Sequence, residues 1–210
     1  MPSRIVRGSL ALVIAGLSGC ATLSEEECAM SDWHTIGFED GSRGYTADRL
    51  GDHRRACAKH GYAPDFDEYQ AGRDEGLRLF CQPSRGFDLG AGGGQYHGVC
   101  APELEPEFLD AYRAGRELHN LRSGVSSANS RIQARQHALE ETKEQIRDKE
   151  AALIAEETTS EERVLLLADL KELAEQAGEI ETEIDLLIDE RARNEERLAA
   201  YEALLAQSGY

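Results

Sequence analysis

Basic residues are scarce in this sequence relative to acidic ones, and the imbalance excludes a class of partners. The 210 residues contain 23 Lys and Arg against 40 Asp and Glu, which gives a formal net charge of −17 at pH 7. A surface of this charge repels the phosphates of nucleic acids and the head groups of anionic lipids. We therefore expect no nucleic-acid partner.

Long apolar runs are also lacking, because the apolar stretch at residues 10–17 is too short to cross a bilayer. It follows a basic start and ends in Leu17-Ser18-Gly19-Cys20, which resembles the processing site of bacterial lipoproteins. The resemblance implies cleavage before Cys20 and acylation of its thiol and new amino group, which together anchor a protein stably. The alternative is an ordinary secretory signal that happens to contain a cysteine. We expect a signal peptide at 1–19, a lipidated linker at 20–27 and membrane contact through the lipid.

Motifs for catalysis and cofactor binding are missing as well. The chain has no Gly-x-Ser-x-Gly elbow and no His-Glu-x-x-His helix, and the glycine-rich residues 90–95 lack the Lys-Ser/Thr that ends a phosphate loop. His53, Cys57 and His60 share a helical face with metal-like spacing, but zinc needs three or four ligands and a disulfide would consume Cys57. We expect no catalytic residue, metal or cofactor, and no enzymatic activity.

Four cysteines remain once Cys20 is assigned to lipid, and outside the cytosol such residues form disulfides. Sequence alone allows three pairings. Short loops favour Cys28 with Cys57 and Cys81 with Cys100, while metal ligation or free thiols are the alternatives.

Composition changes near residue 116, after which residues 116–207 contain no Cys, Pro or Trp and are dominated by helix-forming residues. Apolar residues recur there with a heptad spacing, which predicts a coiled coil over 118–207. Its first seam consists of Leu118, Val125, Ile132, Leu139, Ile146 and Leu153, and its second of Leu166, Leu170, Leu173, Ile180, Ile184 and Leu187.

A break near residues 156–161 interrupts the heptads. Thr159-Ser160-Glu161-Glu162 has the form of a capping box that opens a new helix, and the arms on either side are nearly equal in length. Equal arms favour an antiparallel helical hairpin. The alternative is one continuous helix in a parallel dimer or trimer, with Asn194 fixing the register.

Residues 28–117 repeat a pattern of two glycines four apart, or of an aromatic residue one helical turn before a glycine. Gly37 with Gly41 and Gly72 with Gly76 each lie on one helical face, so another backbone can approach closely. We expect helices at 34–43, 47–60, 66–81 and from 103 onward, with a loop at 86–100. The fold class is therefore all-α: a small disulfide-stapled helical domain followed by a long coiled coil.

These motifs in order also carry a family resemblance. The pattern resembles the bacterial lipoprotein family with domain of unknown function 2799, through Trp33-x-x-Ile-Gly37, Asp40-Gly41, Gly44, Cys57, Gly61, Tyr69-x-x-Gly72, Gly76-Leu77, Cys81, Gly86, Gly90, Tyr96, Cys100 and Tyr112-x-x-Gly115. The resemblance implies an envelope lipoprotein of Gram-negative bacteria and supplies no catalytic residues. In such bacteria an Asp directly after the lipidated cysteine favours retention in the inner membrane. This chain has Ala21 there, which indicates that the protein is held in the outer membrane and faces the periplasm.

The leading hypothesis is a lipid-anchored structural or adaptor protein that engages a protein partner, or itself, through its coiled coil. A second hypothesis is a binding module in which Trp33, Tyr69 and Tyr96 hold a cell-wall saccharide or small ligand beside the glycine loop. A peptidoglycan hydrolase is the third.

Overall fold

The computed structural model describes residues 24–208, which form two compact units divided between residues 79 and 80. Cys20 and the expected signal peptide lie outside the described residues. The described part is helical and contains no strand, and none of its helices has an apolar run long enough to cross a membrane. The expected all-α fold is confirmed.

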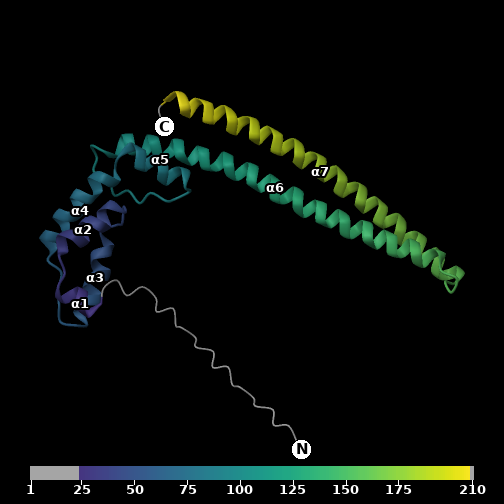
Figure 1. Ribbon diagram of the computed structural model, residues 1–210, viewed down its shortest axis with the longest axis horizontal. Helices are drawn as coiled ribbons and strands as arrows, with labels where there is room; N and C mark the ends of the chain where they lie inside the picture. Colours follow the sequence, from purple (N-terminus) through teal and green to yellow (C-terminus); the bar gives the residue numbers. More distant parts are fainter. Residues whose placement is uncertain (1–23, 209–210) are drawn as a thin grey trace, which may run out of the picture. The chain divides into compact units, whose positions relative to one another are not determined.

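The first unit contains the helices α1 (Glu25–Ala29), α2 (Trp33–Ser42), α3 (Asp48–Ala58) and α4 (Phe66–Phe80) (Figure 1). Helix α1 begins with a capping box between Ser24 and Glu27, inside the segment expected to be a linker. Asp32 caps α2 by accepting hydrogen bonds from the backbone N–H groups of residues 34 and 35. The core consists of the Cys28–Cys57 disulfide, Trp33 and Tyr69.

Glycines hold α2 and α4 together at backbone contact distance. A Cβ atom at Gly37 would overlap the carbonyl of Tyr69, and one at Gly72 would overlap the carbonyl of His34. Gly41 and Gly76 meet the facing backbone in the same way. The repeated glycine pattern is therefore a packing device in this unit.

The second unit contains α5 (Pro83–Ala91), α6 (Glu105–Ile154) and α7 (Ser160–Ser208). The expectation of a loop at 86–100 is wrong over its first part, because residues 86–91 belong to α5. Pro83 begins this helix, and Gly86 and Gly90 let it approach the backbone of α6 at Phe108 and Tyr112. The contact with α6 stabilises a helix that its glycine content disfavours.

Helices α6 and α7 run side by side in opposite directions and form an antiparallel hairpin (Figure 1). They are joined by residues 155–159, close to the expected break. Helix α6 is continuous through residues 117 and 118, where the sequence suggested a domain boundary, and it packs on α5 as well as on α7.

Candidate functional site

The two units contain matching halves. Gly37, Gly41 and Gly44 in the first have the spacing of Gly86, Gly90 and Gly93 in the second, and Gly44 and Gly93 both have positive φ angles. The Cys57-to-Tyr69 spacing likewise equals that from Cys100 to Tyr112, and each unit has one disulfide, Cys28–Cys57 or Cys81–Cys100. These are the two pairings that the short loops favour.

An arginine follows the shared tyrosine and glycine in each half and binds the end of the preceding turn. Arg73 Nη2 donates to the carbonyl of Tyr45 at 3.0 Å, and Arg116 Nη1 donates to the carbonyl of Gly93 at 3.1 Å. The tyrosine hydroxyl differs between the halves: that of Tyr112 donates to a backbone carbonyl, whereas that of Tyr69 donates to a carboxylate.

That carboxylate is Asp40, the centre of a buried polar cluster in the first unit. Its Oδ2 lies 2.7 Å from Nε2 of His53 and accepts a hydrogen bond of 2.9 Å from the hydroxyl of Tyr69. Nε of Arg49 lies 3.6 Å from Oδ1. Asp40 is 5% exposed and His53 3% exposed, so both side chains are buried.

The electrostatics of the cluster favour an ionised Asp40. Burial raises the pKa of this carboxyl, but hydrogen bonds from His53 and Tyr69 and the nearby charges of His53 and Arg49 outweigh burial and bring the pKa below its usual value. Burial and the hydrogen bond to Asp40 raise the pKa of Tyr69 well above its usual range. The cluster is a charged structural network within the core.

The residues with metal-like spacing have other partners. His53 contacts Asp40, Cys57 is in a disulfide, and Nδ1 of His60 lies 3.5 Å from a carboxylate oxygen of Glu25. Among residues 24–208, no group of three or more His, Cys, Asp or Glu side chains is arranged to hold a metal ion.

The aromatic residues suggested for saccharide binding do not form an exposed platform. Trp33 and Tyr69 are buried in the first unit. Tyr96 is half-buried in the second unit, where its ring packs against Phe108 and its hydroxyl donates to Glu105 and accepts from the N–H of Cys100. All three residues are core components.

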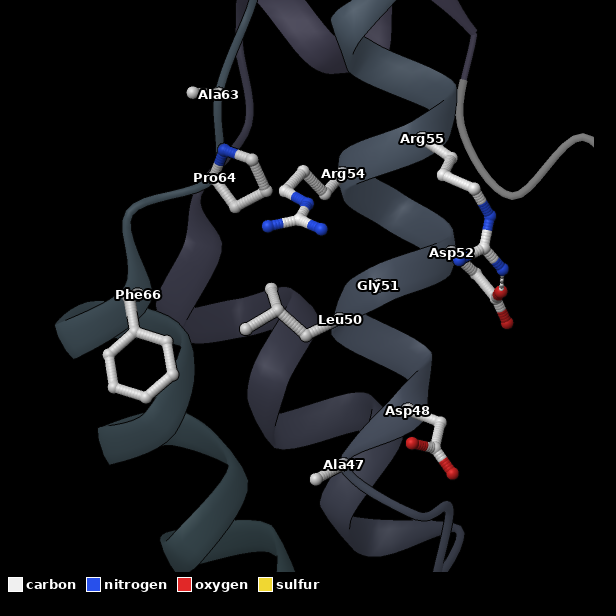
Figure 2. Close-up of a pocket in the computed structure, with 10 residues that line it drawn as sticks. All are labelled: Ala47, Asp48, Leu50, Gly51, Asp52, Arg54, Arg55, Ala63, Pro64 and Phe66. Atoms are coloured by element: carbon white, nitrogen blue, oxygen red, sulfur yellow. Dashed lines mark hydrogen bonds and ion pairs between the residues drawn. The ribbon is translucent and has the colours of Figure 1, made fainter.

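An open groove of about 680 Å³ lies between α3 and the start of α4. Figure 2 shows Leu50, Pro64 and the ring of Phe66 around this space, with the guanidinium of Arg54 beside them and the Asp52–Arg55 ion pair turned to the other side of α3. Phe66 is exposed. This groove has apolar walls and a guanidinium beside them.

The predicted coiled-coil seam closes within the chain. Its buried members are Leu118, Ile132, Leu139, Leu173, Ile180, Ile184 and Leu187, and its half-buried members are Val125, Ile146, Leu153, Leu166 and Leu170. Asn194, which would fix the register of a parallel oligomer, lies opposite Gly124 of α6 instead. The seam is therefore occupied by the chain's own helices.

Five ion pairs across the hairpin each join a cation of α6 to a carboxylate of α7. They are Arg122–Glu202, Arg131–Glu190, Arg135–Glu183, Lys143–Glu181 and Lys149–Asp169, at 2.6 to 3.2 Å. Each exposed pair contributes little stability alone. Together they favour the antiparallel register, because a shifted hairpin would lose all of them.

The end of the hairpin, residues 152–169, presents a surface that the heptad pattern does not reveal. Ile154, Val164, Leu165 and Leu167 are exposed there, although each is a large aliphatic residue. A recess of about 430 Å³ opens beside them, lined by Leu165, Leu166 and acidic residues. The signal in the sequence is the run of four aliphatic residues at 164–167, of which a narrow seam can bury only one or two.

The fold and these surfaces define an all-α protein with two glycine-packed helix pairs, α2 with α4 and α5 with α6, two disulfides and one helical hairpin. Residues 32–117 match the family model described as Protein of unknown function (DUF2799). The matched segment includes both glycine-packed pairs and ends soon after Gly115. No curated protein and no solved structure matches the chain.

Proposed function

We propose that the chain is a lipid-anchored protein of the bacterial cell envelope, held in the outer membrane facing the periplasm, that acts without catalysis as a spacer or adaptor. The observation that carries the proposal is the closed hairpin of α6 and α7. A paired, salt-bridged hairpin of about fifty residues per helix holds its end away from its base by about 75 Å, at 1.5 Å per residue.

The disulfides support the extracytoplasmic part of the proposal. Four of the five cysteines form two disulfides, a bonding state that persists in oxidising compartments. The fifth is Cys20, at the end of the sequence that resembles a lipoprotein processing site. A lipid on Cys20 would attach a few residues before α1, which the Cys28–Cys57 disulfide ties to α3.

Replacing Cys20 tests the anchor. We expect the parent protein to fractionate with membranes and to show the mass of an acylated N-terminal cysteine, and Cys20→Ala to lose both properties. Cys28→Ala with Cys57→Ala serves as the matched control, since it removes cysteines that we assign to a disulfide and leaves the lipid. A Cys20→Ala protein that remains in the membrane would contradict the anchor.

Ligand binding in the groove beside α3 is a second candidate, favoured by the meeting of Phe66, Pro64 and Arg54 in one hollow. A small cell-wall fragment with a carboxylate would match the apolar walls and the guanidinium. Titrating such muropeptides by calorimetry, with Arg54→Gln as the variant, tests it. The absence of heat with the parent protein would dismiss this candidate.

A further inference from the structure

The end of the hairpin has an unusual density of exposed aliphatic side chains. Ile154 is 79% exposed, Val164 66%, Leu165 65% and Leu167 56%. None of these residues contributes to the seam between α6 and α7. Val164 and Leu167 are three residues apart and share one helical face, whereas Leu165 lines the recess on another. Apolar area exposed on adjoining faces of one helix end is typical of a protein-binding surface.

The loop beneath this surface is held in one conformation. The guanidinium of Arg163 donates to the carbonyls of Leu153, Ala155 and Thr158, and so places a positive charge at the C-terminus of α6. The hydroxyl of Thr158 donates to the carbonyl of Ala152 at 2.7 Å. A surface that is already ordered loses little conformational entropy when a partner binds.

A capping box orders the start of α7. The N–H of Thr159 donates to Oε2 of Glu162 at 2.8 Å, and the N–H of Glu162 donates to the hydroxyl of Thr159 at 3.3 Å. These hydrogen bonds lower the pKa of Glu162, which is therefore ionised at neutral pH. The carboxylate contributes to the charge around the apolar surface.

The rim of the surface is acidic. Glu156, Glu157, Glu161 and Glu162 lie within seven residues, and the guanidinium of Arg163 beside them donates to the loop carbonyls. The recess itself is lined by the apolar Ala152, Ala155, Leu165 and Leu166 together with Glu157, Glu162 and Asp169, of which Asp169 is already paired with Lys149 of α6. A complementary ligand thus needs aliphatic groups at its centre and positive charges at its edge.

We propose that the hairpin end, residues 152–169, is a docking surface for a basic amphipathic helix of a partner protein. Aliphatic side chains of the partner fill the recess and cover Val164 and Leu165, and its lysines or arginines face the glutamates of the rim. The inference rests on the adaptor function proposed above and assigns its partner-binding site. A second copy of the chain fits poorly, because two such ends would bring like-charged rims together.

The probe is a pair of fluorescent helical peptides of about 18 residues, long enough for several turns. One has a leucine face and a lysine face, and the other has glutamate in place of every lysine. Each is titrated into the full chain carrying Cys20→Ser, which removes the proposed lipid. We expect the lysine peptide to bind saturably, with an affinity that falls as salt rises, and the glutamate peptide to bind at least about tenfold more weakly.

Matched variants locate the binding. Val164→Ser with Leu165→Ser is expected to weaken binding about tenfold, whereas Leu186→Ser, in the middle of α7 and 63% exposed, is expected to change it less than about twofold. Glu156→Gln with Glu157→Gln and Glu161→Gln is expected to weaken binding and flatten the salt dependence. Glu162 is left intact because it caps α7.

Two results would overturn the docking surface. One is binding of the lysine peptide that the Val164/Leu165 variant leaves unchanged, or no saturable binding at all. The other is evidence that something else covers the surface. Such evidence would be a dimer of the chain in sedimentation, or binding of the chain to phosphatidylcholine vesicles, that the Val164/Leu165 variant abolishes. Crosslinks to a partner from other positions of the hairpin would meanwhile preserve the adaptor function, so failure of the surface and failure of the function are distinguishable.

Discussion

At the scale of single residues, the glycines of the helix pairs have a role that their neighbours in the hairpin do not share. Gly115 faces the backbone of α5 at Phe87, where a Cβ atom would overlap the carbonyl oxygen. Gly178, in the same compact unit, has open space around it. The same residue type is therefore required at one position and merely tolerated at the other.

This contrast predicts opposite effects of one substitution. Gly115→Ala is expected to lower the free energy of unfolding by about 1–3 kcal/mol, because α5 must move away from α6. Gly178→Ala is expected to raise it by about 0.5–1 kcal/mol, because alanine is the better helix former. Urea unfolding followed by circular dichroism measures both, and equal effects would contradict close packing at Gly115.

Asp40 gives the first unit a dependence of stability on pH. Its pKa in the folded state lies below the usual value, so the unfolded chain binds more protons in the window between the two values. The contribution of Asp40 to the free energy of unfolding is thus fully present above about pH 4, the ordinary pKa of an aspartate. It is lost as the pH falls through the pKa of Asp40 in the folded state. We expect Asp40→Asn to lower stability at neutral pH and to flatten the decline below that range.

Thermal unfolding of the parent and Asp40→Asn proteins between about pH 2 and 7 measures the dependence. Glu68→Gln is the control, since this carboxylate is exposed at the start of α4. A decline of the same steepness in the parent and Asp40→Asn proteins would show that other carboxylates cause it.

At the scale of elements, the hairpin depends on one stripe of α7. Leu187 is 6% exposed in the seam, and its neighbour Leu186 is 63% exposed. Leu187→Ala is expected to cost about 2–4 kcal/mol of unfolding free energy, because it leaves a cavity between the helices. Leu186→Ala is expected to change it by less than about 0.5 kcal/mol.

Chemical denaturation of these two single variants makes the comparison, because each removes the same atoms from adjacent positions. Similar losses for both would mean that the outer face of α7 is also covered. That result would favour a bundle of several chains over the closed hairpin.

The elements differ in how far the sequence reveals them. The heptad seam was predictable because residues such as Ile132 and Leu139 recur at a fixed spacing that only a helix places on one side. Helix α5 was not predictable, because Gly86 and Gly90 lower the helix propensity of this segment and its stability comes from contact with α6. The Asp40–His53 pair was missed because its members are thirteen residues apart and meet only in the fold.

The hairpin end shows the same limit. The capping box at Thr159 was readable from four adjacent residues, and the structure contains it. The exposure of Val164 and Leu165 depends on which stripe of α7 faces α6, and that stripe is set by pairing across the hairpin. Sequence periodicity alone located the seam but not the surface it leaves uncovered.

At the scale of the whole molecule, separate segments have separate proposed tasks. The segment that matches the family of unknown function contains the glycine contacts of both helix pairs and the Cys81–Cys100 disulfide, whereas Cys28 of the other disulfide precedes it. The hairpin continues beyond that segment, and its seam residues are buried or half-buried between α6 and α7. Its end exposes apolar side chains with glutamates around them. We propose that the lipid fixes the location and that the hairpin end selects the partner.

Photo-crosslinking in intact cells would identify the partner of the hairpin end. A photoreactive amino acid is placed at Leu165 in the hairpin end or at Leu186 in the middle of α7, and the adducts are identified by mass spectrometry. We expect one recurrent envelope protein with a basic amphipathic helix, captured from Leu165 and not from Leu186. Adducts of the chain with itself alone, or no adduct from either position, would contradict it.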